Sequence, residues 1–197
     1  MNETEFILIL GDIYTPSRAL CIPNQFKELL RNNKISAVFC TGNLGSDDVK
    51  EELENISTNL YITKGDFDMN DEYPEYLNVK IGEFNFGMIH GHQIVPWGNF
   101  DSLRAIAIQL NCDILISGHT HELSVITKSD RCYINPSTCT GAYQPWSPNP
   151  IPSFVLLAVT GDQIMIYTYQ IGLGIDNDGK PNVNMVKWSK NNRRMDP

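Results

Sequence analysis

The segment CDILISGHTH, residues 112–121, decides how the rest of the chain is interpreted. Its apolar, β-branched part, residues 113–117, predicts a short buried strand. The Gly-His-x-His that follows would then lie just beyond a strand end, where open α/β sheets bind their ligands. A second apolar run, residues 84–89, ends in the same way, in His90-Gly91-His92. Because these two pairs contain all 4 histidines of the chain, we expect metal ligands rather than isolated packing residues.

Three earlier apolar runs predict parallel strands whose ends carry oxygen-bearing side chains. The runs and the residues that follow them are 6–10 with Asp12, 36–41 with Asn43, and 60–63 with Asp66. Helices are expected between the runs, over residues 23–33 and 47–56. Right-handed crossovers place such strands side by side. Asp12, Asn43 and Asp66 should therefore meet at one edge of the sheet.

From residue 76 the pattern changes to alternating apolar residues, which predicts hairpins and a second sheet. The expected strand pairs are 77–81 with 84–88, 122–127 with 131–135, and 154–159 with 163–171, the last of which should close this second sheet. A helix is expected over residues 100–110, and the tail should hold a turn at 176–179 and at most a short strand near 183–188. We predict an α/β fold in a single domain, residues 1–197, whose tail begins near residue 172.

Composition narrows the possible functions. The 5 cysteines are scattered and form no C-x-x-C pair, so neither a disulfide framework nor a cysteine zinc site is expected. The start, MNETE, does not resemble a signal peptide, and no apolar run reaches the length of a membrane helix, which favours a cytoplasmic protein. A net charge of −8 argues against nucleic-acid binding and against direct attraction to anionic lipid. Membrane association is expected only through a partner.

The candidate metal site combines carboxylate, amide and imidazole groups. Its members are Asp12, Asn43, Asp66, His90, His119 and His121. This mixture of ligands suits zinc, manganese or iron, and it exceeds what one tetrahedral ion needs. Two ions about 3.5–4 Å apart would use all of it, holding a phosphate and lowering the pKa of a bridging water.

The order of these motifs resembles that of the calcineurin-like metallophosphoesterases, which carry D-x-H, G-D, G-N-H-D, H-G and G-H-x-H. The resemblance implies a sandwich of two β-sheets flanked by helices (αββα), with the metals at its rim. It assigns Asp12, Asn43 and His121 to one ion, and Asn43, Asp66, His90 and His119 to the other. His92 matches no ligand of that family and is expected to support its loop.

Three departures from the family pattern bear on activity. Tyr14 stands at the histidine of D-x-H, Asn43 at the bridging aspartate, and Phe67 at the catalytic histidine of G-N-H-D. An amide offers only one good oxygen for two cations. Phe67 cannot protonate a leaving oxygen, which removes a contribution of about 10²–10⁴-fold. We therefore predict no catalytic residue and at most one tightly bound zinc or manganese ion, in the four-ligand site.

Within that family, several segments together resemble a eukaryotic branch, the small subunits of retromer. They are 40–44, 65–68, 89–93, 96–98, 113–121 and 140–143. The resemblance implies a non-catalytic scaffold of the endosomal cargo-recognition complex. Such a scaffold would bind the α-solenoid retromer subunit through the metal-site face, recruit regulators through another apolar patch, and reach the endosome membrane only through the complex. The alternative left open is a metal-dependent phosphoesterase with an altered mechanism.

The loop after His92 supplies the candidate partner-binding residues. Ile94, Val95 and Trp97 are large and apolar, but no periodicity assigns them to a helix or a strand. We expect them to be exposed beside the metal site, as anchors of the interface with the solenoid subunit. If the loop folded inward, Trp97 would be the residue expected to become buried.

Overall fold

The first sheet is organised around β1 (Glu5–Leu10), whose last four residues are fully buried. β1 pairs in parallel with β2 (Ala37–Cys40), which pairs in parallel with β3 (Leu60–Ile62). The connections pass through α1 (Asn24–Arg31) and α2 (Asp47–Glu54). This computed structural model describes residues 3–31, 34–69, 71–128, 130–172 and 181–190. The three parallel strands predicted from the sequence, with a helix in each of the two connections, are confirmed.

Three antiparallel strands extend the first sheet on the other side of β1. They are β9 (Ser153–Thr160), β10 (Gln163–Gln170) and β11 (Asn182–Ser189), giving the order β11-β10-β9-β1-β2-β3. The expectation that the β9–β10 hairpin closes the second sheet is therefore wrong. The reason lies in β9 itself, where Phe154 and Leu156 pack toward the helices while Val155 and Leu157 pack toward the other sheet. A strand buried on both faces belongs inside a sheet, and β9 pairs directly with β1.

The tail carries a longer strand than its sequence predicts. β11 pairs with β10 along its whole length, from Asn182 opposite Gln170 to Ser189 opposite Gln163. Its strongest anchor is Trp188, which is buried and lies 5.6 Å from the ring of Phe84. The predicted turn at 176–179 lies outside the described residues.

The second sheet packs face to face against the first. It contains β4 (Tyr76–Ile81), β5 (Phe84–Ile89), β6 (Ile114–Ser117), β7 (Ser124–Lys128) and β8 (Arg131–Asn135), in the order β4-β5-β6-β8-β7. The parallel pair β5–β6 is joined through α3 (Phe100–Gln109), the helix that the sequence predicts over residues 100–110. Aromatic packing joins the two sheets, because the rings of Phe39 on β2 and Phe86 on β5 lie 5.4 Å apart.

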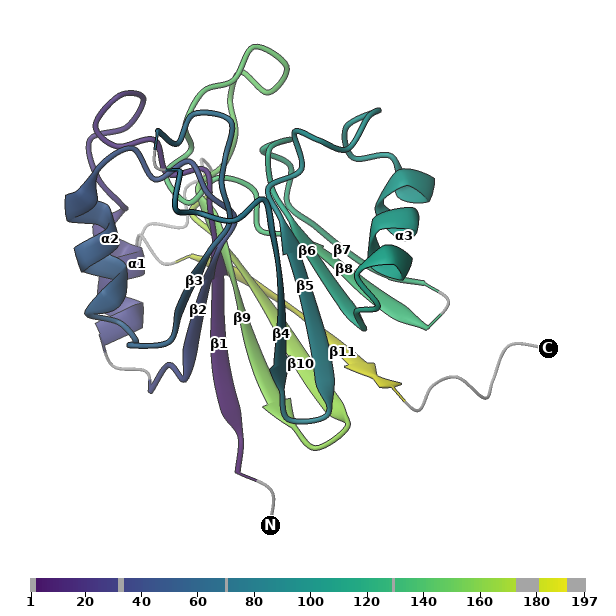
Figure 1. The fold of residues 1–197 in the computed structure, drawn as a ribbon. Coiled ribbons are helices and arrows are strands. Elements are labelled where there is room, and N and C mark those ends of the chain that lie inside the picture. Colours follow the sequence, from purple (N-terminus) through teal and green to yellow (C-terminus); the bar gives the residue numbers. More distant parts are fainter. Residues whose placement is uncertain (1–2, 32–33, 70, 129, 173–180, 191–197) are drawn as a thin grey trace.

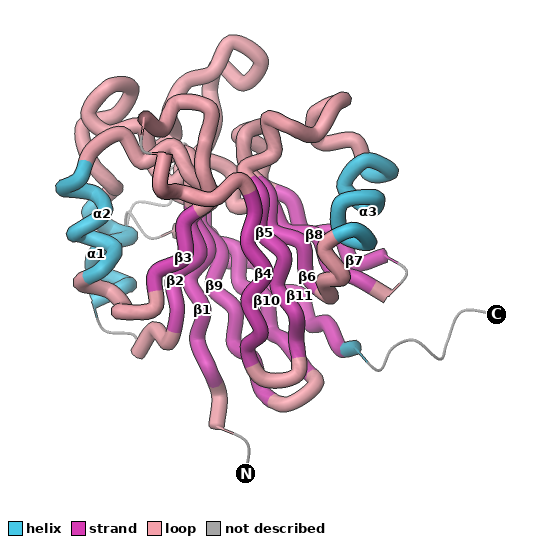
Figure 2. Tube along the Cα trace, viewed as in Figure 1, coloured by secondary structure: helices cyan, strands magenta, loops and turns pink. Residues whose placement is uncertain are grey.

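The helices cover the two outer faces of this sandwich. Figure 1 shows α1 and α2 on one side and α3 on the other, which confirms the αββα arrangement. The loops that follow β1, β2, β3, β5 and β6 gather at one edge, drawn at the top of Figure 2. None of the helices in the described part of the chain is long and apolar enough to cross a membrane.

Candidate metal centre

All six predicted ligands come together at this edge, and five of them are almost completely buried. The tightest group is formed by Asp66, His90 and His119, whose ligand atoms all lie within 4.8 Å of one another. Oδ1 of Asp66 is 3.1 Å from Nε2 of His90 and 3.7 Å from Nδ1 of His119. One carboxylate oxygen and two imidazole nitrogens at this spacing suit a zinc or manganese ion.

Asp12 and His121 form the second half of the centre. Nε2 of His121 lies 3.4 Å from Oδ1 of Asp12, and the other carboxylate oxygen accepts a 2.9 Å hydrogen bond from the backbone N–H of His119. Asp12, His119 and His121 all have positive φ angles, of 51°, 68° and 57°, so tight loops direct these side chains inward. Burial raises the pKa of Asp12, but the charges of His90 and His121 and hydrogen bonds outweigh it, so the pKa lies below its usual value.

Backbone carbonyls hold two of the histidine rings in place. Nδ1 of His90 donates to the carbonyl of Thr41 at 2.7 Å, and Nδ1 of His121 donates to the carbonyl of Ala142 at 2.7 Å. A carbonyl only accepts hydrogen bonds, so Nδ1 carries a proton in both rings and Nε2 faces the centre. This arrangement is common among metal-binding histidines. It fixes the ring orientation before an ion arrives.

Unpartnered buried nitrogens also suit a metal ion. Both ring nitrogens of His119 and Nε2 of His121 are buried and have no hydrogen-bond partner among the residues that the structure describes. Leaving such polar atoms unpaired costs about 1–3 kcal/mol each. An ion bound at the centre would satisfy them, so the residues present fit the metal that the motif order implies.

Asn43 occupies the middle of the centre through its amide nitrogen. Nδ2 lies 3.1 Å from Oδ1 of Asp12, 3.0 Å from Oδ1 of Asp66 and 2.6 Å from the hydroxyl of Tyr14. Its oxygen faces outward and accepts a 2.9 Å hydrogen bond from the backbone N–H of Phe67. A Cβ at Gly65 would collide with this amide, which explains the glycine. Ligation by Asn43 requires the amide to turn over, so its role as a shared ligand stays a prediction.

Tyr14 fills the space where the motif order expects a histidine. Its hydroxyl accepts hydrogen bonds from Nδ2 of Asn43, at 2.6 Å, and from Nε2 of Gln144, at 2.8 Å. Burial and the nearby carboxylates of Asp12 and Asp66 raise the pKa of Tyr14 far above its usual value. A neutral phenol is a poor metal ligand, so the second ion position is weakened on this side.

Phe67 stands at the mouth of the centre and carries no polar group toward it. Its side chain is 54% exposed, and its ring meets the edge of Tyr14 with centroids 5.5 Å apart. The ring can neither donate nor accept a proton in a reaction.

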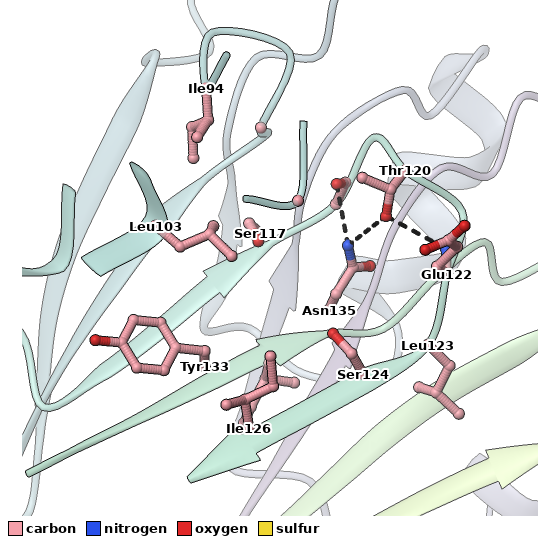
Figure 3. A pocket seen from close by; sticks show the side chains of 14 residues that line it. Ile94, Leu103, Ser117, Thr120, Glu122, Leu123, Ser124, Ile126, Tyr133 and Asn135 are labelled. Atoms are coloured by element: carbon pink, nitrogen blue, oxygen red, sulfur yellow. Dashed lines mark hydrogen bonds between the residues drawn. The ribbon is translucent and has the colours of Figure 1, made fainter. Parts of the chain in front are cut away.

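The loop carrying His119 and His121 is held in place by Asn135 at the end of β8. Nδ2 of Asn135 donates to the carbonyl of Gly118 at 3.1 Å and to Oγ1 of Thr120 at 2.9 Å. Figure 3 shows these bonds at the end of a cavity of about 240 Å³ between the loop, α3 and β8. The cavity borders the centre but contains none of its ligands.

Ile94 lines this cavity, so the expectation that its side chain is exposed is wrong. It is only 4% exposed and packs with Leu103 of α3, so it is not a surface anchor. Val95 is 75% exposed and Trp97 is 47% exposed, so these two remain available to a partner. Of the three residues, Ile94 rather than Trp97 is the buried one. The loop leads into α3, and this contact has no signature in the local sequence.

Two tryptophans cover the centre, and the sequence indicated only one of them. The rings of Trp97 and Trp146 lie 4.5 and 5.1 Å from that of His119 and 4.7 Å from each other. Trp146 belongs to a loop without a motif, so no local signal predicts its position. His92 packs 5.3 Å from His90, and its backbone carbonyl accepts a hydrogen bond from Nε1 of Trp97, which supports the loop.

Comparison with known proteins agrees with this architecture. Residues 5–162 match the calcineurin-like phosphoesterase superfamily domain, and the chain belongs to that superfamily. The chain is 32% identical to vacuolar protein sorting-associated protein 29 of Schizosaccharomyces pombe, over 93% of this chain and 98% of that protein.

Solved structures extend the similarity to the whole fold. Vacuolar protein sorting 29 from Cryptosporidium parvum is 40% identical and superimposes with a TM-score of 0.88, covering 94% of this chain and 98% of that one. Wild-type Vps29 from Entamoeba histolytica in complex with Zn²⁺ is 36% identical, with a TM-score of 0.83 and coverage of 94% and 99%. A relative with this fold therefore binds zinc.

Proposed function

We propose that the chain is a non-catalytic scaffold subunit of retromer, acting in protein transport from endosomes. Support comes from the Schizosaccharomyces and Cryptosporidium relatives, which are named for vacuolar protein sorting. The observation that carries the non-catalytic part is Phe67, an exposed aromatic ring at the position of the family's catalytic histidine. Catalysis of phosphoester hydrolysis needs a group there that donates a proton to the leaving oxygen.

The centre of the site gives the proposal a second support. The Asn43 amide already places N–H donors between the carboxylates of Asp12 and Asp66. These hydrogen bonds partly replace a second cation, because they stabilise the negative charges of the two carboxylates. We therefore expect one zinc or manganese ion at Asp66, His90 and His119, with a structural role. Bound zinc would supply Lewis acidity, but the Phe67 ring at the mouth offers no group for proton transfer to a leaving oxygen.

In this proposal, Val95 and Trp97 are the anchor residues of the partner-binding surface. Both are exposed, and Trp97 packs directly on the ligand His119. Exposed apolar residues over a rigid base are suited to anchor an interface. We propose that the α-solenoid subunit of retromer docks here, that regulators bind elsewhere, and that the chain reaches the endosome membrane only through the complex.

Affinity purification of the tagged chain from its own cells tests this function. The proposal expects a large helical-repeat protein to copurify with the wild type, and much less of it with Val95→Asp at equal expression. Recovery of the wild type without such a protein would contradict the scaffold function.

A metal-dependent phosphoesterase with an altered mechanism is the second candidate. The observation in its favour is the set of inward-facing nitrogens on His119 and His121. Its test is hydrolysis of an aryl phosphate and a phosphodiester with added zinc or manganese.

A further inference from the structure

Arg18 holds an unusual position at the mouth of the metal centre. Its guanidinium lies 4.2 Å from the ring centroid of Tyr14 and 4.3 Å from that of Phe67. One of its nitrogens, Nη1, donates to the backbone carbonyl of Tyr143 at 3.2 Å. Within the described part of the chain this is its one side-chain hydrogen bond, and no carboxylate there forms an ion pair with it. The side chain is half-buried.

These contacts orient the guanidinium without neutralising it. Arginine has five N–H donors in a planar fork that matches the two oxygens of a carboxylate. Stacking on aromatic rings fixes the plane of the fork, so less side-chain entropy is lost when an anion binds. Among the described residues, the stacking and the Tyr143 bond leave the positive charge without a carboxylate partner. Its remaining donors are available to a ligand.

The surroundings of Arg18 are apolar and exposed. We use the name aromatic rim for Phe67, Val95, Trp97, Tyr143 and Trp146, which are all exposed large apolar residues. The Phe67 ring and the backbone carbonyl of Tyr143 contact Arg18, while the rings of Trp97 and Trp146 contact each other beside His119. The loops that carry them lie at the same edge of the sandwich (Figure 1). Arg18 therefore places a positive charge at the edge of the sandwich that also carries these exposed apolar side chains.

We propose that Arg18 gives the docking face its specificity for charge. It would form an ion pair with an aspartate or glutamate carboxylate of the partner. The acidic side chain would lie on the guanidinium fork, while apolar residues next to it in the partner's sequence cover the aromatic rim. This ion pair would determine which segment of the partner docks and how it is aligned, because the aromatic rim alone would accept many apolar segments. This inference rests on the proposed function, which makes this edge the docking face.

Three variants test the charge in binding to the purified solenoid subunit. Arg18→Gln is expected to weaken binding about tenfold and to flatten its salt dependence, whereas Arg18→Lys keeps most of both. Arg31→Gln, at the exposed end of α1, is the matched control and should leave both unchanged. Melting temperatures separate a binding defect from misfolding.

Carbodiimide coupling identifies the acid itself. In Arg18→Lys the new amine should form an amide with an aspartate or glutamate of the bound partner, which mass spectrometry locates. Pretreatment of the partner with phosphatase should change nothing; loss of binding there would assign Arg18 to a phosphate instead and overturn the proposal.

The outcomes also separate this inference from the proposed function. If Val95→Asp abolishes binding while Arg18→Gln binds with wild-type affinity and salt dependence, the docking face stands and the role of Arg18 is wrong. If neither variant affects binding, the partner docks elsewhere and both proposals fail.

Discussion

The backbone N–H of Phe67 donates a 2.9 Å hydrogen bond to Oδ1 of Asn43. This bond decides which end of the Asn43 amide faces the metal centre. Because the oxygen is held outward, the nitrogen points between Asp12 and Asp66 and acts there as a donor. Phe67, which stands where the family has its catalytic histidine, thus also stabilises an orientation of the Asn43 amide that disfavours a second metal ion.

The number of bound ions follows from this arrangement. We expect one zinc or manganese equivalent per chain after dialysis, held by Asp66, His90 and His119. His119→Ala should lose it. Elemental analysis of the dialysed protein measures the ratio, and two tightly held equivalents per chain would contradict the account.

Activity should be absent even when the metal is present. The purified chain is expected to show no turnover of aryl phosphates or phosphodiesters above contamination, since Phe67 supplies no proton. Phe67→His alone should restore little, because Asn43 and Tyr14 remain. Wild-type hydrolysis that disappears in a folded His119→Ala variant would overturn this prediction.

Asn43→Asp exchanges the central donor for a third carboxylate. Without metal the variant should lose about 2 kcal/mol of unfolding free energy, because three negative groups then face one another. Zinc should restore the loss and stabilise the variant more than the wild type, since a carboxylate bridges two cations better than an amide. Thermal unfolding in chelator and in zinc measures both effects.

Asn78→Asp is the control for that exchange. Asn78 is exposed on β4, away from the centre, so its variant should unfold like the wild type in both buffers. Equal melting temperatures of Asn43→Asp and wild type in chelator would show that the amide does not hold the carboxylates.

The metal-free protein should lose stability as the pH rises past neutrality. Burial lowers the pKa of His90, but the charge of Asp12 and the hydrogen bond to Asp66 outweigh it and raise the pKa above its usual value. Folding therefore favours the protonated ring. This stabilisation is complete below about pH 6.5 and is lost as the pH rises through the folded-state pKa.

Zinc should have the opposite dependence on pH, because it competes with the proton on His90. The gain in melting temperature on adding zinc should grow between about pH 5.5 and 8.5. Calorimetric scans with chelator and with zinc across this range check the prediction. A zinc effect that is constant with pH would contradict it.

The sequence predicted the parts of the molecule that depend on local pattern. Strands such as β1 and β6 are continuous apolar runs that end in ligand side chains, so both the strands and the residues Asp12, His119 and His121 could be identified. The hairpin β9–β10 was also recognised, but its sheet was not, because pairing with β1 is a contact between distant segments. Local periodicity says which face of a strand is apolar, not which strand lies beside it.

The remaining features depend on contacts that no spacing records. Ile94 is buried because its loop packs on α3, and Trp146 reaches His119 from an irregular loop. The orientation of the Asn43 amide depends on one backbone donor from a distant turn. The setting of Arg18, which has no carboxylate partner among the described residues, likewise depends on Phe67 and Tyr143 from distant segments.

Binding of the purified chain to the purified solenoid subunit, measured by calorimetry with Val95→Asp, tests the docking claim most directly. Val95 is 75% exposed, so the variant should fold and melt like the wild type. Burying an unpaired carboxylate in the interface should raise Kd at least about 100-fold. Val183→Asp, at a residue 50% exposed on β11, makes the same exchange on another surface and should bind normally. A folded Val95→Asp variant with the wild-type Kd would contradict docking at the metal-site rim.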